Sequence, residues 1–375
     1  KTKIAEKEAG DITQHIGAYE IEIQPKTKGK EILRSAQDNF VSTGHKITFI
    51  DTPGHEAFAK MRSRGAKAAD IAILVVAADE GVKLQTKESI KIIQEAAIPF
   101  IVAIAKIDKS AANPEKVKNE LIEVGVLLEG RGGDVPWVEV SSKTGQGIDE
   151  LLELIILLAE MQELKANPNN PASGLVIESH LDRLRGNTAS LIITDGTLHL
   201  KDEIVVGNVT GKIKILEDFQ GRPIKEATFS APVRVVGFES LAPVGENFLV
   251  GKTRLQIVEP VVQSQKITKE LGKKDSKIRI PVIIKSDAFG SSEALEEIIG
   301  ELGKENDWCF EVLKNEVGDI SESDFKIVPE GKTLIISFRV RRKPEVNNLL
   351  LTNKNLILVT GDIVYEIKDK VEELV

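Results

Sequence analysis

Between residues 47 and 163 the sequence alternates short apolar runs with segments of helical periodicity, and this alternation limits the possible folds more than any other feature. Near-continuous runs of Val, Ile and Ala are typical of strands covered on both faces. The intervening segments place apolar residues three and four positions apart, as amphipathic helices do. The pattern predicts a doubly wound α/β domain with a mostly parallel sheet. The expected strands are ITFID (47–51), IAILVVAA (71–78), FIVAIAKID (100–108) and WVEVSS (137–142), and the expected helices are 87–97, 114–125 and 148–164.

A segment rich in proline and asparagine, residues 164–174, ends this domain, because these residues and glycine disfavour continuation of a helix. Short strands with Asp-Gly and Gly-Asn turns follow and predict a small antiparallel β-barrel that ends near Val250. From Ser276 a strand, a helix over 291–304 and further alternation predict a third, α/β/α domain. The expected division is 1–165 for the first domain, 171–258 for the barrel, 259–275 for a polar helix or linker and 276–375 for the third domain.

Length and charge restrict the functions that fit. The 375 residues suffice for two or three domains, each with its own core. With 50 Lys and Arg against 58 Asp and Glu the net charge is -8, so any contact with RNA requires a local basic patch. The run RVRRK (339–343) is such a patch, although a basic strand end can equally be a solvated surface. The most apolar stretch, 151–161, is too short to span a bilayer, and no membrane role is expected.

Cysteine and histidine usage points to the cytoplasm and away from a metal centre. Cys309 is the only cysteine, which excludes an internal disulfide and favours a reducing, cytoplasmic setting. Its neighbours Trp308 and Phe310 predict a buried thiol. The spacing of the histidines among themselves and to the cysteine predicts no zinc site. The histidines considered are His15, His45, His180 and His199.

The motif DTPGH (51–55) directly follows the strand ITFI. Ligand sites in open parallel sheets lie at the carboxyl ends of the strands, where this motif falls. A single D-T-P-G can also be a structural turn. Two later strands end in polar signatures as well, AKID (105–108) and SSK (141–143). Three such turns can converge on one crevice, and this favours a ligand site.

This order of motifs resembles the P-loop GTPases of translation, and the surrounding sequence is most similar to the family of bacterial translation initiation factor two. The resemblance covers nearly the whole chain. It implies a P-loop GTPase-like, doubly wound α/β domain that is truncated at its N-terminus, followed by the barrel and the α/β/α domain. The segments that carry it include GDITQHIGAYE (10–20), ITFIDTPGHEAFAKMRSRGAKAADIAILVVAADEGV (47–82), VSSKTGQGIDELLE (140–153), ASGLVIESHLDRLRG (172–186), DGTLHLKDEIVVG (195–207) and IKSDAFGSSEALEE (284–297).

The resemblance implies GTP or GDP and Mg²⁺ as cofactors and assigns roles at the phosphate end of the site. Thr13 would ligate Mg²⁺ and meet the γ-phosphate from a switch segment ordered only while that phosphate is present. Asp51 would hold the same Mg²⁺ through water. Gly54 would let the backbone approach the γ-phosphate, and His55 would orient the attacking water as the catalytic residue. The remaining residues implied here are Gln14, His15, Ile16 and Gly17 in the switch, and Thr52 and Pro53 in the nucleotide site.

At the base end, Asp108 would accept two hydrogen bonds from the guanine edge, and Lys106 would lie across the base. The pocket would be completed by Ile107 beside them and by Ser141, Ser142 and Lys143.

The chain departs from the family pattern in three places. The 375 residues contain no G-x-x-x-x-G-K-[ST] loop, so their nucleotide binding should be badly impaired; the family has this loop just upstream of the helix that leads into ITQHIG. The nearest match, GENFLVGKT (245–253), has one residue too many, lies in the expected barrel and is interpreted as coincidence. Ala105 stands where the family has Asn, so the hydrogen bonds of that amide are lost. Their loss should cost roughly 1 to 3 kcal/mol of nucleotide-binding free energy, or about 5- to 150-fold in affinity. Asp11 replaces a glycine of the switch.

By resemblance, the function is that of a monomeric translation initiation factor GTPase. It would place initiator tRNA on the small ribosomal subunit and promote joining of the large one, with GTP hydrolysis driving its release. The barrel that grips the formylmethionyl end of the tRNA would follow Val375. One alternative is a degenerate, nucleotide-free module that only binds the ribosome. The other is an elongation or selenocysteine-delivery factor, which an antiparallel third barrel would support. The polar excursion 24–45 is expected on the surface.

Overall fold

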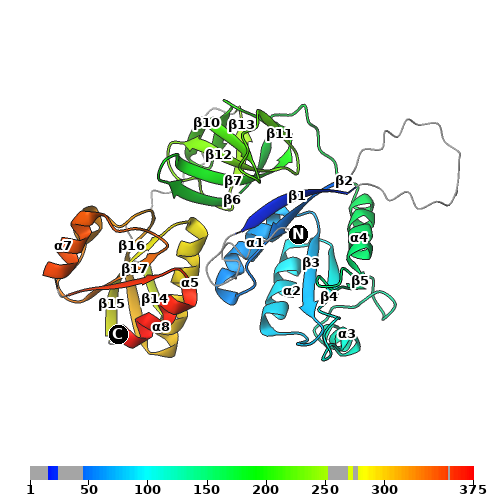
Figure 1. The fold of residues 1–375 in the computed structure, drawn as a ribbon, viewed down its shortest axis with the longest axis horizontal. Helices are drawn as coiled ribbons and strands as arrows, with labels where there is room; N and C mark the ends of the chain where they lie inside the picture. The colour runs from blue at the N-terminus through cyan, green and yellow to red at the C-terminus, as the bar shows by residue number, and fades with distance from the viewer. Residues whose placement is uncertain (1–15, 24–44, 252–268, 273–277, 354) are drawn as a thin grey trace, which may run out of the picture.

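The structure is a computed structural model that describes residues 16–23, 45–251, 269–272, 278–353 and 355–375 (Figure 1). Its first domain contains a three-stranded parallel sheet of order β3-β4-β5, with matching registers such as Val75 beside Ala103. Apolar residues of the strands and helices fill the core between them, as their periodicity predicts. The elements are β3 (Ala72–Ala77), α2 (Leu84–Ala96), β4 (Phe100–Ala105), α3 (Pro114–Glu123), β5 (Trp137–Glu139) and α4 (Ile148–Met161).

The strand ITFID does not join this parallel sheet, contrary to the expectation. It forms β2 (His45–Asp51), which pairs antiparallel with β1 (Gly17–Ile23) in a separate two-stranded sheet. Within the described residues β3 has β4 as its only strand partner, and Val75 of β3 is 62% exposed. An apolar run shows that a segment is extended and half-buried, but it does not specify the neighbour with which the segment pairs, and here the neighbour is β1.

The barrel predicted after the 164–174 segment is present and closed, with strand order β10-β12-β7-β6-β13-β9. Closure removes the sheet edges, and aliphatic side chains with Phe248 fill the interior. The short strands β8 and β11 form a pair outside the barrel. The strands are β6 (Ser173–Asp182), β7 (Gly186–Asp195), β8 (Thr197–His199), β9 (Glu203–Val206), β10 (Val209–Asp218), β11 (Glu226–Thr228), β12 (Pro232–Phe238) and β13 (Asn247–Val250).

The third domain is the predicted α/β domain, a five-stranded sheet of order β14-β16-β15-β17-β18. Four strands are parallel, and only β14 runs antiparallel, beside β16. Residues 269–272, expected in a polar helix or linker, form β14, because the backbone pairing with β16 does not require an apolar pattern at a sheet edge. The elements are β14 (Lys269–Gly272), β15 (Ile278–Ser286), α5 (Phe289–Glu305), β16 (Trp308–Val317), α6 (Glu322–Phe325), β17 (Thr333–Phe338), α7 (Pro344–Thr352), β18 (Leu356–Gly361) and α8 (Val364–Leu374).

One hydrophobic cluster runs through all three domains. Phe58 and Met61, from the helical segment that follows DTPGH, pack in it with Ile177 of the barrel and Leu295 of α5. This segment consists of η3 (Glu56–Phe58) and α1 (Ala59–Ala68). Figure 1 shows α5 and α8 on the side of the third domain that faces α1. The segment after DTPGH is therefore bound to the third domain by buried apolar surface.

Three further observations concern the cysteine, membrane-spanning helices and metal-binding groups. Cys309 is fully buried on β16, as its aromatic neighbours predict. Across the described ranges, no helix is long and apolar enough to cross a membrane. The same residues hold no group of three or more histidine, cysteine or acidic side chains arranged to bind a metal ion.

Candidate functional site

The DTPGH turn begins at the end of β2 and is fastened by a buried arginine. Arg62 of α1 is 7% exposed, and its Nη1 donates to the carbonyl oxygen of Pro53 at 3.0 Å and to that of His55. Its Nη2 donates to Glu88 Oε2 of α2 at 2.9 Å. One guanidinium therefore ties two carbonyls of the turn to a neighbouring helix. Arg62 could not be predicted as a site residue, because nothing in MRSRG distinguishes it from a surface cation.

Two residues of the turn differ in what surrounds them. A side chain added at Gly54 would meet no described atom within 4 Å, so packing inside the protein does not require glycine there. His55 caps η3, and its Nδ1 accepts a hydrogen bond from the Ala57 amide at 3.2 Å. Burial lowers the pKa of His55 below its ordinary value of 6.5, and the neutral imidazole is thereby favoured. Nδ1 is engaged as an acceptor, which leaves Nε2 to carry the proton of that neutral form.

The structure brings AKID and SSK together at the carboxyl ends of β4 and β5. Asp108 Oδ1 accepts a hydrogen bond from the Ser141 hydroxyl at 2.6 Å, and Ser141 is fully buried. That hydrogen bond lowers the pKa of Asp108 and favours its charged form. Gly147 closes the turn after SSK with a φ of 74°, and a Cβ there would lie 1.9 Å from the Glu139 carbonyl oxygen. Glycine is required at this position for the turn after SSK to pack against the end of β5.

Lys106 adopts a left-handed backbone, with a φ of 61°, a conformation that is uncommon for residues other than glycine and frequent at functional sites. Its Nζ donates to Glu80 Oε1 at 2.8 Å, and this hydrogen bond raises the pKa of Lys106. Lys109 Nζ donates to Asp79 Oδ2 at 2.6 Å. The two acidic residues follow β3 directly and were not predicted as site residues. They engage both lysines of the loop that follows β4.

The remaining predicted residues have different outcomes. Thr13, Gln14 and His15, together with Asp11, lie outside the described residues. Ile16 is buried in the cluster shared by the three domains, and Gly17 pairs with Asp51 at the start of β1. Ile107 donates its amide to the Val140 carbonyl at 3.5 Å, and Ser142 and Lys143 are exposed beside Ser141. Ala105 ends β4 and packs beside the small cluster of Ala103, Val138 and Val140, without a polar side-chain contact.

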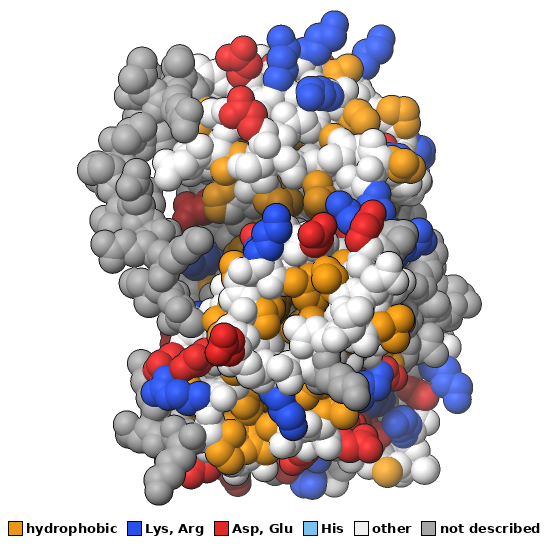
Figure 2. All heavy atoms as spheres, turned by 90° about the vertical axis from the view of Figure 1, so that its left-hand side faces the viewer, with side chains coloured by type: hydrophobic (Ala, Val, Ile, Leu, Met, Phe, Trp, Pro, Cys, Tyr) orange, Lys and Arg blue, Asp and Glu red, His pale blue; other side chains and the backbone are white. Residues whose placement is uncertain are grey.

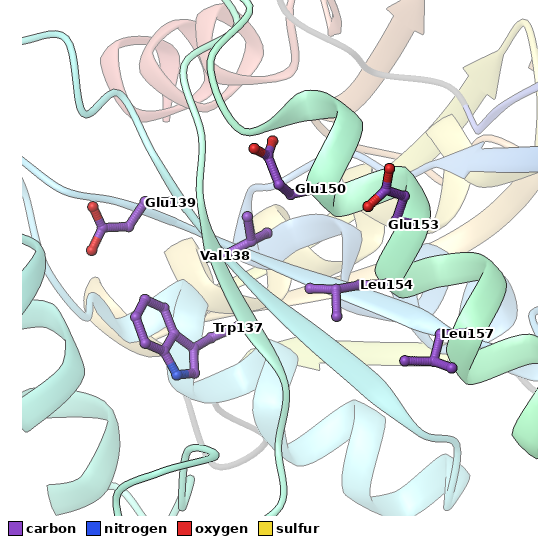
Figure 3. Close-up of a pocket in the computed structure, with 7 residues that line it drawn as sticks. All are labelled: Trp137, Val138, Glu139, Glu150, Glu153, Leu154 and Leu157. Carbon is purple, nitrogen blue, oxygen red and sulfur yellow. The ribbon is translucent and has the colours of Figure 1, made fainter. Parts of the chain in front are cut away.

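The cavity between β5 and α4, of about 530 Å³, contains none of the predicted site residues. In Figure 3 the side chains of Trp137, Leu154 and Leu157 lie along it, with acidic side chains from both elements around them. The acidic residues are Glu139, Glu150 and Glu153. Carboxylates repel phosphate groups, so we assign no nucleotide binding to this cavity.

A second cavity, of about 790 Å³, lies between the barrel and the carboxyl edge of the third sheet. The basic run 339–343 contributes to its wall, and Arg341, Arg342 and Lys343 are exposed. Figure 2 shows basic and acidic side chains mixed on this face of the molecule. The loop-like match GENFLVGKT includes the barrel strand β13, with Gly245 before it and Gly251 after it, and this fits its interpretation as coincidence.

Comparison with known proteins assigns each domain. The family description "Elongation factor Tu GTP binding domain" matches residues 2–161, "Elongation factor G domain 2" matches 171–251 and "Translation-initiation factor 2" matches 258–372. Translation initiation factor IF-2 of Aquifex aeolicus is 40% identical over all of this chain, which covers 46% of that protein. The protein of the same name from Persephonella marina is 42% identical over all of the chain, which covers 42% of it. The chain belongs to the translation initiation factor IF-2 family.

Members of the IF-2 family are translational GTPases, and the chain spans about half the length of the curated relatives it matches. One solved structure, described as "Crystal structure of GDP-bound aIF5B from Aeropyrum pernix", is similar over 100% of this chain and 70% of its own, with 25% identity and a TM-score of 0.52. The third domain distinguishes IF-2 from the elongation-factor alternative. Its sheet is mostly parallel and covered by helices, whereas that alternative requires an antiparallel barrel.

Proposed function

We propose that this chain supplies the guanine-recognition and water-orienting parts of an IF-2-type GTPase. The observation that carries the proposal is the convergence of AKID and SSK, where the buried Ser141 holds Asp108 charged at the carboxyl end of the parallel sheet. A fixed carboxylate can accept hydrogen bonds from two adjacent N–H groups of a base edge. Such a pair of donors is present on guanine and absent from adenine.

The DTPGH turn fits the phosphate end of the same nucleotide. Asp51 would hold Mg²⁺ through water, and the open space beside Gly54 leaves room for a phosphate to approach the backbone. Mg²⁺ would neutralise charge on the phosphates when bound. His55, kept neutral by burial and with Nδ1 engaged by the Ala57 amide, can donate a hydrogen bond from Nε2 to water without repelling a cation. Thr13 remains the proposed metal ligand of the switch segment.

The wider role is initiation of translation in the cytoplasm. The proposed partners are both ribosomal subunits and initiator formylmethionyl-tRNA. The exposed cations Arg341, Arg342 and Lys343 offer one contact for ribosomal RNA. We propose that the chain acts as a monomer.

Ala105 favours a second candidate, a nucleotide-free module that binds the ribosome, because its methyl group cannot replace the amide of an asparagine. We predict that Ala105→Asn tightens GDP binding by about 5- to 150-fold, the value of one buried polar contact. The test is a titration of fluorescent GDP, with excess ATP as competitor, on a polypeptide that adds the residues encoded upstream of Lys1. Ala111→Asn, at an exposed position of the same loop, is the matched control and should change nothing.

The two candidates give different results in this titration. Guanine-selective binding at micromolar or lower concentration by the polypeptide with Ala105 supports the GTPase. Binding that appears only after Ala105→Asn supports the nucleotide-free module, and equal affinity of the two proteins would contradict the proposed cost of the alanine.

A further inference from the structure

The ring of His55 rests against an aromatic side chain from the far end of the chain. Tyr365 of α8 meets the imidazole edge to face, with 4.4 Å between ring centroids and an interplanar angle of 77°. Tyr365 also packs against the hydrophobic cluster shared by the three domains. Aromatic pairs prefer this edge-to-face geometry over a parallel sandwich. The proposed water-orienting residue is therefore held by the third domain.

The elements on both sides of this contact are fixed to each other. Phe58 and Met61 are buried in the shared cluster, and a Cβ placed on Gly290 of α5 would lie 2.1 Å from Met61 Cε, which shows that the Met61 side chain packs directly on Gly290. At the border, Arg64 Nη2 donates to Glu293 Oε2 of α5. The position of His55 thus depends on the position of the third domain.

The Tyr365 hydroxyl is the unusual group in this contact. It is buried, and it has no hydrogen-bond partner among the residues that the structure describes. Burial raises the pKa of Tyr365 to about 12, so the phenol stays protonated at neutral pH. Leaving a buried hydroxyl without a partner destabilises the arrangement that buries it. When the two domains separate, water can satisfy this hydroxyl, so a tyrosine favours opening where a phenylalanine would not.

Charged groups near His55 and Tyr365 also affect the pKa values of the two rings. Burial is the largest influence on the pKa of His55 and lowers it, Arg62 and Lys368 lower it further, and Glu56 and Glu88 raise it. On the other ring, Glu56 and Glu301 act with burial to raise the pKa of Tyr365. The contact is therefore mainly one of packing between a neutral imidazole and a neutral phenol.

We propose that Tyr365 is a positioning residue for His55, which holds the imidazole against the third domain and releases it for water orientation when η3 and α8 separate. The inference rests on the proposed GTPase function and adds a control to it. The Tyr365 hydroxyl keeps the closed contact with His55 weak enough to open. Hydrolysis is thereby coupled to movement of the third domain.

The first test uses this chain alone and follows the His55 imidazole by NMR during a pH titration, with His55→Gln to assign the signal. In the wild-type chain the His55 pKa should lie below 6.5 and the signal should carry a ring-current shift. Tyr365→Ala should move the pKa toward 6.5 and remove that shift, because both the cover and the ring are lost. Tyr365→Phe should keep both, and Asp369→Ala, at an exposed position of α8, is the control that should change neither. Identical His55 signals in wild type and Tyr365→Ala would overturn the proposal.

The second test measures intrinsic GTP hydrolysis by the polypeptide that adds the residues encoded upstream of Lys1. Tyr365→Ala should raise kcat by about 2- to 10-fold with KM unchanged, and Tyr365→Phe should lower kcat, since the two changes weaken and strengthen the closed contact. Equal rates in all three proteins would refute the role of Tyr365 and leave the GTPase intact. Absence of hydrolysis in all three, with the NMR contact present, would refute the proposed function and this inference with it.

Discussion

Replacing Asp324 with alanine is expected to lower the free energy of unfolding of the third domain by about 3 to 5 kcal/mol. The Asp324 side chain is 1% exposed, and its Oδ1 accepts hydrogen bonds from Lys285 Nζ at 3.2 Å and from Lys314 Nζ at 2.6 Å. Lys285 is itself 5% exposed. Alanine would leave two lysines, one of them deeply buried, with Glu316 as their remaining anion. Urea unfolding followed by Trp308 fluorescence in a Trp137→Phe background measures the effect.

Two comparisons make this experiment decisive. Glu322→Ala changes an exposed acid in the same short helix and should alter stability by less than about 0.5 kcal/mol.

Burial opposes ionisation of Asp324, but hydrogen bonds from Lys314 and Ser321 and the charge of Lys285 outweigh it and lower the pKa. A depressed pKa makes the contribution complete above the ordinary value of 3.8, and it is lost as the pH falls through the folded-state pKa. The difference between wild type and Asp324→Ala should therefore shrink in acid. A difference independent of pH down to about 2 would contradict the ionic explanation.

Arg62→Ala is expected to destabilise the protein by about 3 kcal/mol and to loosen the DTPGH turn. The substitution removes donors to the carbonyls of Pro53 and His55 and breaks the ion pair with Glu88. Hydrogen exchange of the Phe58 amide, which donates to the His55 carbonyl, should accelerate with the loss of stability. Urea unfolding and exchange measured on the same protein check both parts of the prediction.

The control for Arg62 is Lys60→Ala, an exposed position in the same helix whose ammonium lies 3.9 Å from a carboxylate of α5. An exposed pair at this distance is worth little, and the change should stay within about 0.5 kcal/mol. Arg62→Lys keeps the charge but loses the fork that reaches two carbonyls and a carboxylate, so it should recover only part of the stability. If Arg62→Ala were as stable as Lys60→Ala, the turn would not depend on the guanidinium.

The sequence was most informative where burial on both faces leaves a simple pattern. The expected strand 71–78 contains β3, the helix 114–125 contains α3, and β15 begins where the apolar run of the third domain begins. Two assignments failed because strand pairing is not local information. The run 47–51 pairs with β1 instead of the parallel sheet, and 269–272 forms an edge strand without an apolar pattern.

The site shows the same division. The meeting of AKID and SSK could be predicted because both motifs follow strands of the parallel sheet, whereas DTPGH follows β2, which lies outside that sheet. Arg62 and Tyr365 could not be predicted, because their partners are backbone carbonyls in one case and a ring from another domain in the other. The switch residue Thr13 lies outside the described residues, and its role stays a proposal.

The cluster shared by the three domains also determines which parts of the chain melt together. Phe58 and Met61 belong to it, whereas the core of β3 and β4, with Leu74 and Ile104, is a separate cluster. On heating, the segment after DTPGH should unfold together with the third domain, even though its sequence position assigns it to the first domain. Calorimetry should then show cooperative unfolding units whose boundary lies within the first domain, between α1 and α2, where Arg62 and Glu88 form an ion pair.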